Sequence, residues 1–441
     1  MVTEKDKIHK FYLNICENIV VDGLEEYNIR ELLYNEAFYA QNSGWKEAVK
    51  SLINAMAIEM TDMKSIVAEY KNNDLLLIST KWNRRDHDEY WNKICSVFSE
   101  YTRISIGDKT LNILSRIRRM SFRRFVRNIT IAKKIYKQFE MIDNRKHKIY
   151  LVSKLIMLKD IHCYLETVNI SPKVVMCFFD SGFFENVAMN FYKKRGAITV
   201  TNQHGQPVYK SHDYDRMNQS QVLNFKCDYF FAKGLFTKKQ FIKAGIDGNR
   251  VIIVDSFNKI NNLMLKVQCY KTFCVFLNCI ALQNSSQLNA KLVEIAKVFS
   301  ERNGYKFYLK IHPTDDVENY RNINCNNLLG VINTEKSMDE IVREIDFAIY
   351  NQSAIFLDLL DHKVRAYRWD DGEEFPLIDN ENDEFDEVET LEKLCKLWDS
   401  KTVNEKNQYF YRTSMYYNGE GNAKENIEKT IINLLNKNTI D

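Results

Sequence analysis

Three short polar motifs hold the residues whose types could carry out chemistry, and the first is the loop His204-Gly205-Gln206-Pro207. The chain has only 14 glycines, 4 prolines and 8 histidines, yet one residue of each type lies in the short loop after the strand-like run 197–201. A histidine at a strand end can remove a proton near neutral pH. The glycine after it lets a substrate approach the backbone closely. His204 is therefore a candidate general base, although taken alone the loop fits an ordinary turn equally well.

The second motif, His312-Pro313, follows the strand-like run "KFYLK". Proline ends the strand and holds the residue before it extended. Lys310 lies two residues before His312, so in a strand both side chains share a face. A lysine and a histidine together suit a diphosphate, whereas the alternative is a strand-end histidine with a solvated lysine.

The third motif, "NQSAIFLD", opens a predicted helix at Gln352-Ser353. The unpaired N–H groups of a helix start and a serine hydroxyl can bind an anion. Serine is also a routine helix cap, so a purely structural role competes with anion binding. Asp358 follows on the same helix, where it could contact a nucleotide or only pack nearby.

The elements that must position these motifs alternate between apolar strands and helices from Asp74 onward. Such alternation predicts parallel sheets covered on both faces. We expect an α/β protein with two Rossmann-like domains facing a cleft, divided as an N-terminal helical segment 1–72, a first domain 73–257 and a second domain 258–441. Because ligands bind beyond the carboxyl ends of parallel strands, all three motifs fall where a site is expected.

Bulk composition excludes several classes of protein. The net charge of +3 on 441 residues argues against a chain that coats nucleic acid. We find no apolar run long enough to span a membrane and no signal peptide. The ten cysteines form no CxxC pair. Asp213-Tyr214-Asp215 has a metal-binding spacing but lies past the loop, so we expect no metal, with this aspartate pair as the alternative. A cytoplasmic protein, or one held at the inner face of a membrane, is expected.

The basic segment 114–139 interleaves cations with apolar residues, and its candidate surface residues are Arg118, Arg119, Arg123 and Arg124. As a helix it is amphipathic, like those that lie on anionic membranes. It could equally be a docked helix with solvated arginines. A nucleic-acid contact is a third interpretation, against which the low net charge speaks.

The order of the three motifs resembles the GT-B glycosyltransferase superfamily. It is most similar to bacterial transferases of the CDP-glycerol glycerophosphotransferase (teichoic acid) type, with His-Gly-x-Pro-x-Lys, then His-Pro, then a serine pair. Bacterial sialyltransferases and Kdo transferases share the last two motifs and also use cytidine nucleotides. The resemblance covers about residues 170–370. Lys210 falls three residues after Pro207 instead of two, and Ala354 replaces the second serine.

The resemblance implies a GT-B transferase for capsule polysaccharide or teichoic-acid-like polymers, with CDP or CMP as leaving group and no bound cofactor or metal. His204 would be the base and His312, with Lys310, would stabilise the leaving phosphate. The donor would also contact Gly205, Pro313, Gln352, Ser353 and Asp358. The acceptor would be lipid-linked or an oligosaccharide, near Lys210 and the arginines.

The resemblance makes 73–257 the acceptor-side domain and 258–441 the nucleotide-donor domain, with a sialyl- or Kdo-type glycosyltransferase as an alternative. Two functions of other classes also remain open. A sugar-nucleotide epimerase or hydrolase of the same fold would need carboxylates in the cleft, and the sequence reveals no clear set. A non-catalytic subunit of a polymer-synthesis complex would use residues 1–72 and the basic helix as interaction surfaces.

Overall fold

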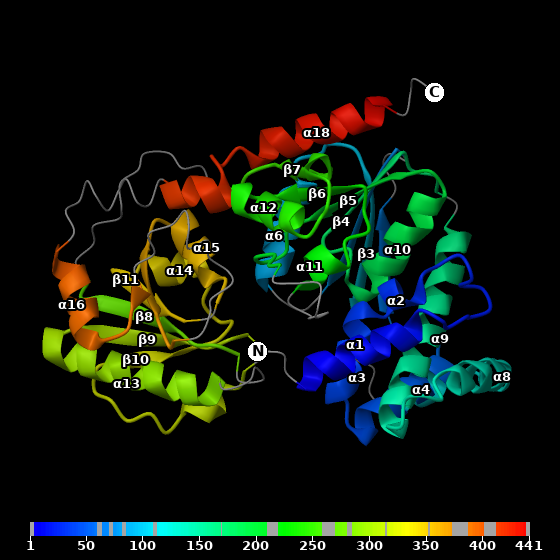
Figure 1. The fold of residues 1–441 in the computed structure, drawn as a ribbon, viewed down its shortest axis with the longest axis horizontal. Helices are drawn as coiled ribbons and strands as arrows, with labels where there is room; N and C mark the ends of the chain where they lie inside the picture. Colours follow the sequence, from blue (N-terminus) through cyan, green and yellow to red (C-terminus); the bar gives the residue numbers. More distant parts are fainter. Residues whose placement is uncertain are drawn as a thin grey trace.

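The chain forms two α/β domains that lie side by side (Figure 1). The structure, a computed structural model, describes residues 4–59, 64–69, 74–81, 85–108, 113–168, 170–209, 219–257, 270–279, 285–313, 315–351, 353–372, 387–400 and 412–437. Within these ranges, no helix is long and apolar enough to cross a bilayer.

The first domain is built on a seven-stranded sheet in the order β1-β3-β2-β4-β5-β6-β7. Its strands are β1 (Lys64–Glu69), β2 (Leu75–Lys81), β3 (Thr102–Asp108), β4 (Val174–Cys177), β5 (Ile198–Asn202), β6 (Tyr229–Ala232) and β7 (Val251–Ile253). All neighbours are parallel except β1 and β3. The expectation that residues 1–72 are helical throughout is therefore wrong for β1, which extends the sheet at its edge.

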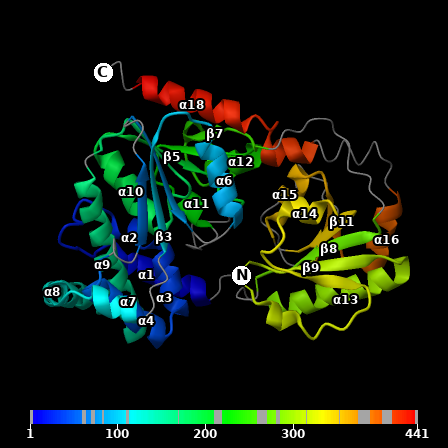
Figure 2. The same ribbon diagram turned by 180° about the vertical axis from the view of Figure 1, so that it is seen from behind.

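The helices of this domain cover both faces of the sheet (Figure 2). They are α1 (Glu4–Cys16), α2 (Ile29–Leu32), α3 (Tyr34–Asn42), α4 (Trp45–Ala57), α6 (Arg85–Cys95), α7 (Ile113–Arg119), α8 (Phe122–Gln138), α9 (Arg145–Thr167), α10 (Phe183–Lys194), α11 (Ser220–Leu223) and α12 (Leu235–Lys243). A 3-10 turn, η2 (Gly248–Arg250), precedes β7.

The N-terminal helices share one apolar core with the sheet. Leu13 of α1 and Leu33 before α3 belong to the same buried cluster as Leu155 of α9 and Val175 of β4. Burying apolar surface is the main favourable term in folding, so α1 to α4 are stabilised by the domain on which they lie.

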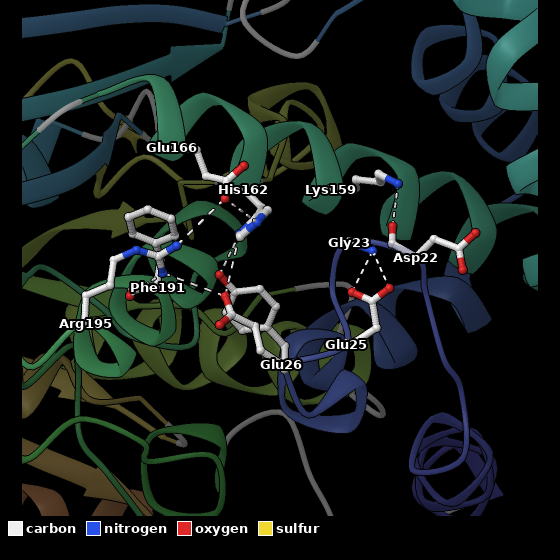
Figure 3. Close-up of polar contacts among 10 residues, drawn as sticks. Asp22, Gly23, Glu25, Glu26, Lys159, His162, Glu166, Phe191 and Arg195 are labelled. Atoms are coloured by element: carbon white, nitrogen blue, oxygen red, sulfur yellow. Dashed lines mark hydrogen bonds and ion pairs between the residues drawn. The ribbon is translucent and has the colours of Figure 1, made fainter.

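Polar contacts fasten the loop between α1 and α2 onto α9 and α10 (Figure 3). The Tyr27 hydroxyl lies 2.7 Å from His162 Nδ1. Arg195 reaches Glu26 at 3.8 Å and Glu166 at 3.9 Å. These groups bind to one another, which favours a structural role for the network.

The second domain holds a parallel six-stranded sheet in the order β10-β9-β8-β11-β12-β13. Its strands are β8 (Thr272–Phe276), β9 (Lys306–Lys310), β10 (Leu328–Ile332), β11 (Phe347–Tyr350), β12 (Arg365–Trp369) and β13 (Glu387–Val388). Its helices are α13 (Ser285–Asn303), η3 (Val317–Tyr320), α14 (Met338–Val342), α15 (Ile355–Asp361) and α16 (Leu391–Ser400). Separate apolar clusters cover the two faces of this sheet.

The chain finally returns to the first domain. Helix α18 (Ala423–Lys437) lies along that domain in both views (Figures 1 and 2). Its residues Ile427, Ile431 and Leu434 join the apolar cluster that contains Leu75 and Met176. The predicted boundary at residue 258 assigns the whole of 258–441 to the second domain. It therefore misses that the C-terminal helix packs on the first domain and completes it.

Candidate functional site

His204 lies in a loop that follows β5 and is held by neighbouring amides. The Gln221 side chain accepts a hydrogen bond from His204 N at 2.8 Å and donates one to His204 O. Gln203 Oε1 accepts from Lys233 N at 2.8 Å. Gly205 has a φ of +64°, and no heavy atom lies within 4 Å of the place a Cβ would take. The loop is thus fixed in position and leaves space beside the glycine, as the predicted site requires.

The His204 imidazole is oriented by aromatic rings. Its centroid lies 4.4 Å from that of His87, edge to face, and 5.3 Å and 5.2 Å from those of Phe178 and Phe179. The phenylalanines follow β4, and His87 belongs to α6. His204 keeps partial exposure, so the residue is accessible in part, as a general base must be. His87 was not predicted, because it gives no strand-end signal.

Lys210, Asp213 and Asp215 lie outside the described residues, and so does Gln352 of the third motif. Their predicted roles stay predictions.

The second motif follows β9, as expected. Asp315 N donates to His312 O at 2.9 Å, which makes a tight turn at Pro313. Lys310 Nζ donates to Ile311 O at 3.0 Å. The side chains of Lys310, His312 and Pro313 are all half-buried. The motif therefore lies at the carboxyl end of a central strand with part of its surface accessible.

His312 also belongs to a group that could hold a metal ion. One atom each of Cys279, His312 and Asp315 lies within 4.8 Å of the others. Sulfur, nitrogen and carboxylate oxygen are the ligand types of zinc, and three protein ligands leave a fourth position open. This group could not be predicted from the sequence. Cys279 follows β8, and it becomes a neighbour of His312 only because β8 pairs with β9.

The third motif begins its helix later than predicted. Ala354 is the N-cap of α15, and Ser353 Oγ accepts a hydrogen bond from Ile355 N at 3.3 Å. One N–H group of the helix start is thus bonded within the chain. Asp358 lies exposed on this helix, one turn before Asp361.

Asp358 and Asp361 form part of a charged cluster in which the two domains meet. Lys233, directly after β6, lies with its Nζ 5.0 Å from the ring centroid of Tyr90 on α6. Burial alone would lower the pKa of Lys233, but the charges of Tyr90, Asp358 and Asp361 outweigh it and raise that pKa. The strand-end rule that selected His204 selects Lys233 as well, so this residue could have been found from the sequence.

Asp361 is the member of this cluster whose pKa lies near neutral pH. Burial raises the pKa of Asp361 to about 6, with Asp358 acting in the same direction and Lys233 opposing. Asn418 Nδ2 donates to its Oδ1 at 2.6 Å, and Ser256 Oγ donates at 3.3 Å. A carboxyl group so perturbed beside a cation is a candidate acid or base.

The basic segment forms two helices, α7 and α8, instead of one. Arg118, Arg119 and Arg123 are exposed. Arg124 is only 5% exposed and forms an ion pair with Asp160, so its predicted place on the surface is wrong. Its side chain points from α8 into the domain and also donates to Ala55 O.

Comparison with known proteins supports the fold and nothing finer. No described protein family and no curated protein matches the sequence. Among solved structures, a UDP-N-acetylglucosamine 2-epimerase is similar at a TM-score of 0.50 and 8% identity, over 85% of this chain and 98% of that one. UDP-GlcNAc 2-epimerase from Methanocaldococcus jannaschii reaches a TM-score of 0.49 at 13% identity, over 82% and 99%. The lipopolysaccharide outer core galactosyltransferase WaaB reaches 0.45 at 10%, over 81% and 99%.

Such identities report on the fold alone. The similarity to the 2-epimerase, together with the two sheets, confirms the predicted α/β fold of two Rossmann-like domains. The more specific resemblance to CDP-glycerol transferases finds no support in these comparisons and stays a prediction.

Proposed function

We propose that the protein is a transferase for a bacterial surface polysaccharide or teichoic-acid-like polymer. It would move a glycosyl or polyol-phosphate group from a nucleotide-activated donor, first of all a cytidine nucleotide, to a hydroxyl acceptor. The observation that supports this most is the fixed loop that presents the His204 imidazole beside the open backbone of Gly205. The preference for cytidine rests only on the resemblance of the three motifs.

The chemistry follows from these positions. His204 removes the proton of the acceptor hydroxyl, and the freed oxygen bonds to the anomeric carbon or phosphorus of the donor. The bond from that atom to the nucleotide breaks, and its electron pair leaves on a phosphate oxygen of CDP or CMP. Lys310 and His312 stabilise that charge. We propose that the reaction needs no metal or cofactor.

The test combines nucleotide binding with transfer. In a thermal-shift panel of CDP, CMP, UDP, GDP and ADP, a ligand of the folded state raises the melting temperature. We expect cytidine nucleotides to stabilise both the wild type and His204→Ala, while His204→Ala loses transfer by about 100-fold or more. His162→Gln, which alters a histidine of the same domain bonded to Tyr27, should keep transfer.

Three results would contradict the proposal. If no nucleotide raises the melting temperature, the chain does not bind an activated donor. A response to UDP alone removes the cytidine preference. If a polymer-synthesis complex containing His204→Ala keeps full activity, the chain acts there as a non-catalytic subunit.

A sugar-nucleotide epimerase or hydrolase is a second candidate, favoured by the cluster of Lys233, Asp358 and Asp361. The sequence had shown no clear set of carboxylates, and this cluster supplies one. The 2-epimerase of similar fold points to the same class. Such an enzyme would convert UDP-GlcNAc without an acceptor, which NMR at C2 of the sugar detects. Asp361→Asn would then abolish activity and His204→Ala would not.

A further inference from the structure

We propose that the first domain docks onto an anionic lipid bilayer through one face formed by α7 and the solvent side of α8. We call this surface the lipid-docking face. It goes beyond the proposed transfer reaction and is tested independently of it. Four observations carry it: apolar exposure, charge, helix orientation and position in the molecule.

Large apolar side chains stand exposed on α7 and α8. Phe122 at the start of α8 is 81% exposed and Leu114 on α7 is 68% exposed, followed by Ile117 at 59% and Val126 at 51%. Single exposed apolar residues are ordinary, but a concentration of them marks an interaction surface. In the sequence these side chains flank the break between the two helices.

Helix α4, whose end meets the break between α7 and α8, has an exposed apolar stripe of its own. Trp45, Val49 and Ile53 are 54%, 42% and 46% exposed and follow one another four residues apart. Residues at that spacing share one helix face. Ser121 N donates to Ala57 O at 2.8 Å, which places the end of α4 against the break between α7 and α8.

The same face is strongly basic. From residue 109 to residue 139 the sequence contains no aspartate or glutamate. The cations exposed there are Arg118, Arg119, Arg123, Arg127, Lys133, Lys134 and Lys137. Of these, Lys134 forms an ion pair with Asp22 at 3.2 Å. Since the whole chain carries a net charge of only +3, positive charge is concentrated here.

The orientation of α8 separates this face from the core. Arg124 and Asn128 point inward, where Asn128 Nδ2 donates to Ala55 O at 3.2 Å. At 3.6 residues per turn, Phe122, Val126 and Lys133 then lie on the opposite, solvent side. Apolar anchors and cations are therefore presented together, outward from the domain.

The position of α8 leaves it accessible. It lies at the end of the first domain that is far from the second domain in both views (Figures 1 and 2). A bilayer could approach this end while the strand ends near the domain junction stay in water.

Anionic lipid is the partner that this mixture fits. Apolar side chains can enter the boundary between headgroups and acyl chains while cations contact phosphates. Each lysine or arginine near such a surface contributes about 1 kcal/mol. A nucleic acid would neutralise the cations but leave Leu114, Ile117 and Phe122 in water.

The experiment is co-sedimentation of the full chain with vesicles of phosphatidylcholine alone or with about one third phosphatidylglycerol. We expect binding only to the anionic vesicles, falling as salt screens the charges. Arg118→Ala/Arg119→Ala/Arg123→Ala should lower partitioning by about 100-fold, about fivefold per cation. Phe122→Ser should weaken binding without changing its salt dependence.

The control removes the same charge elsewhere. Lys424, Lys429 and Lys437 are exposed on α18, and their triple substitution by alanine should leave binding close to wild type. Equal losses in both triple variants would overturn the docking face, because binding would then follow net charge alone. So would equal binding to neutral vesicles, or a dimer in solution that Phe122→Ser dissociates. None of these results affects the nucleotide thermal shifts, so the transfer proposal stands or falls separately.

Discussion

At the scale of single residues, Asp361 links protonation to the contact between domains. Its carboxyl group belongs to α15 of the second domain, while Lys233 and Tyr90 approach from the first. The opposing charge of Lys233 does not offset the cost of burial, so Asp361 favours its protonated form up to about pH 6. A carboxyl group that exchanges its proton so close to neutrality can serve proton transfer.

Asp361→Asn should change the pH dependence of stability. The folded-state pKa of about 6 lies above the ordinary 3.8, so the folded state holds the extra proton between these values. The contribution of this proton to the free energy of unfolding is complete below pH 3.8. It is lost as the pH rises through about 6. The variant should therefore gain melting temperature relative to the wild type between pH 4 and pH 7.

Differential scanning fluorimetry across that range measures the effect. Glu428→Gln, which alters an exposed carboxylate on α18, should give a constant difference from the wild type. A constant difference for Asp361→Asn as well would show that the junction does not perturb this group.

At the scale of elements, two adjacent arginines of helix α8 have opposite environments. Arg123 is exposed, whereas Arg124 turns inward to Asp160, whose pKa is raised by burial and lowered by Arg124. The alternation of charge and apolar residues indicates an amphipathic helix but cannot tell which cation faces the core. That choice depends on Ala55 of α4 and Asp160 of α9, which lie 69 and 36 residues away from Arg124 in the sequence.

Arg124→Ala should be strongly destabilising. It leaves the largely buried Asp160 carboxylate without its guanidinium partner, and breaking a buried pair on one side costs about 3–5 kcal/mol. Arg123→Ala is the matched control and should change stability by no more than about 0.5 kcal/mol. Urea unfolding followed by circular dichroism measures both, and similar losses would place Arg124 on the surface after all.

The sequence predicts elements well where a local pattern is strong. The apolar runs of β4, β6 and β8 are buried strands, and the exits of β5 and β9 carry the expected histidines. The edge strand β1 and its neighbour β3 were missed, because neither forms a continuous apolar run and they pair with each other from distant parts of the sequence. His87 and Cys279 were missed for a different reason, since only the order of strands and helices in space makes them neighbours.

At the scale of the whole molecule, the domains touch through a close backbone contact. Gly234 precedes α12 in the first domain, and a Cβ there would lie 2.3 Å from the carbonyl of Tyr417. Beside it, Phe236 stacks on Tyr417 with ring centroids 4.9 Å apart and joins the apolar cluster of the second domain. Glycine is thus needed for two backbones to meet, even though its own conformation is an extended one.

Gly234→Ala should loosen this contact. The methyl group must displace backbone on one side, at a cost of about 1–3 kcal/mol. We expect a lower melting temperature and faster proteolysis between the domains. Gly330→Ala, where a Cβ meets no heavy atom within 4 Å, is the matched control. Unchanged stability in Gly234→Ala would show that the domains do not depend on this approach.

The return of α18 to the first domain has a consequence for synthesis. Ile431 and Leu434 close an apolar cluster whose other members, such as Leu75 and Met176, leave the ribosome hundreds of residues earlier. Until α18 emerges, that part of the first domain stays open to water, while the second domain already has its own clusters. We infer that the domain made first is completed last, so a chaperone that shields exposed apolar surface would act on it throughout translation.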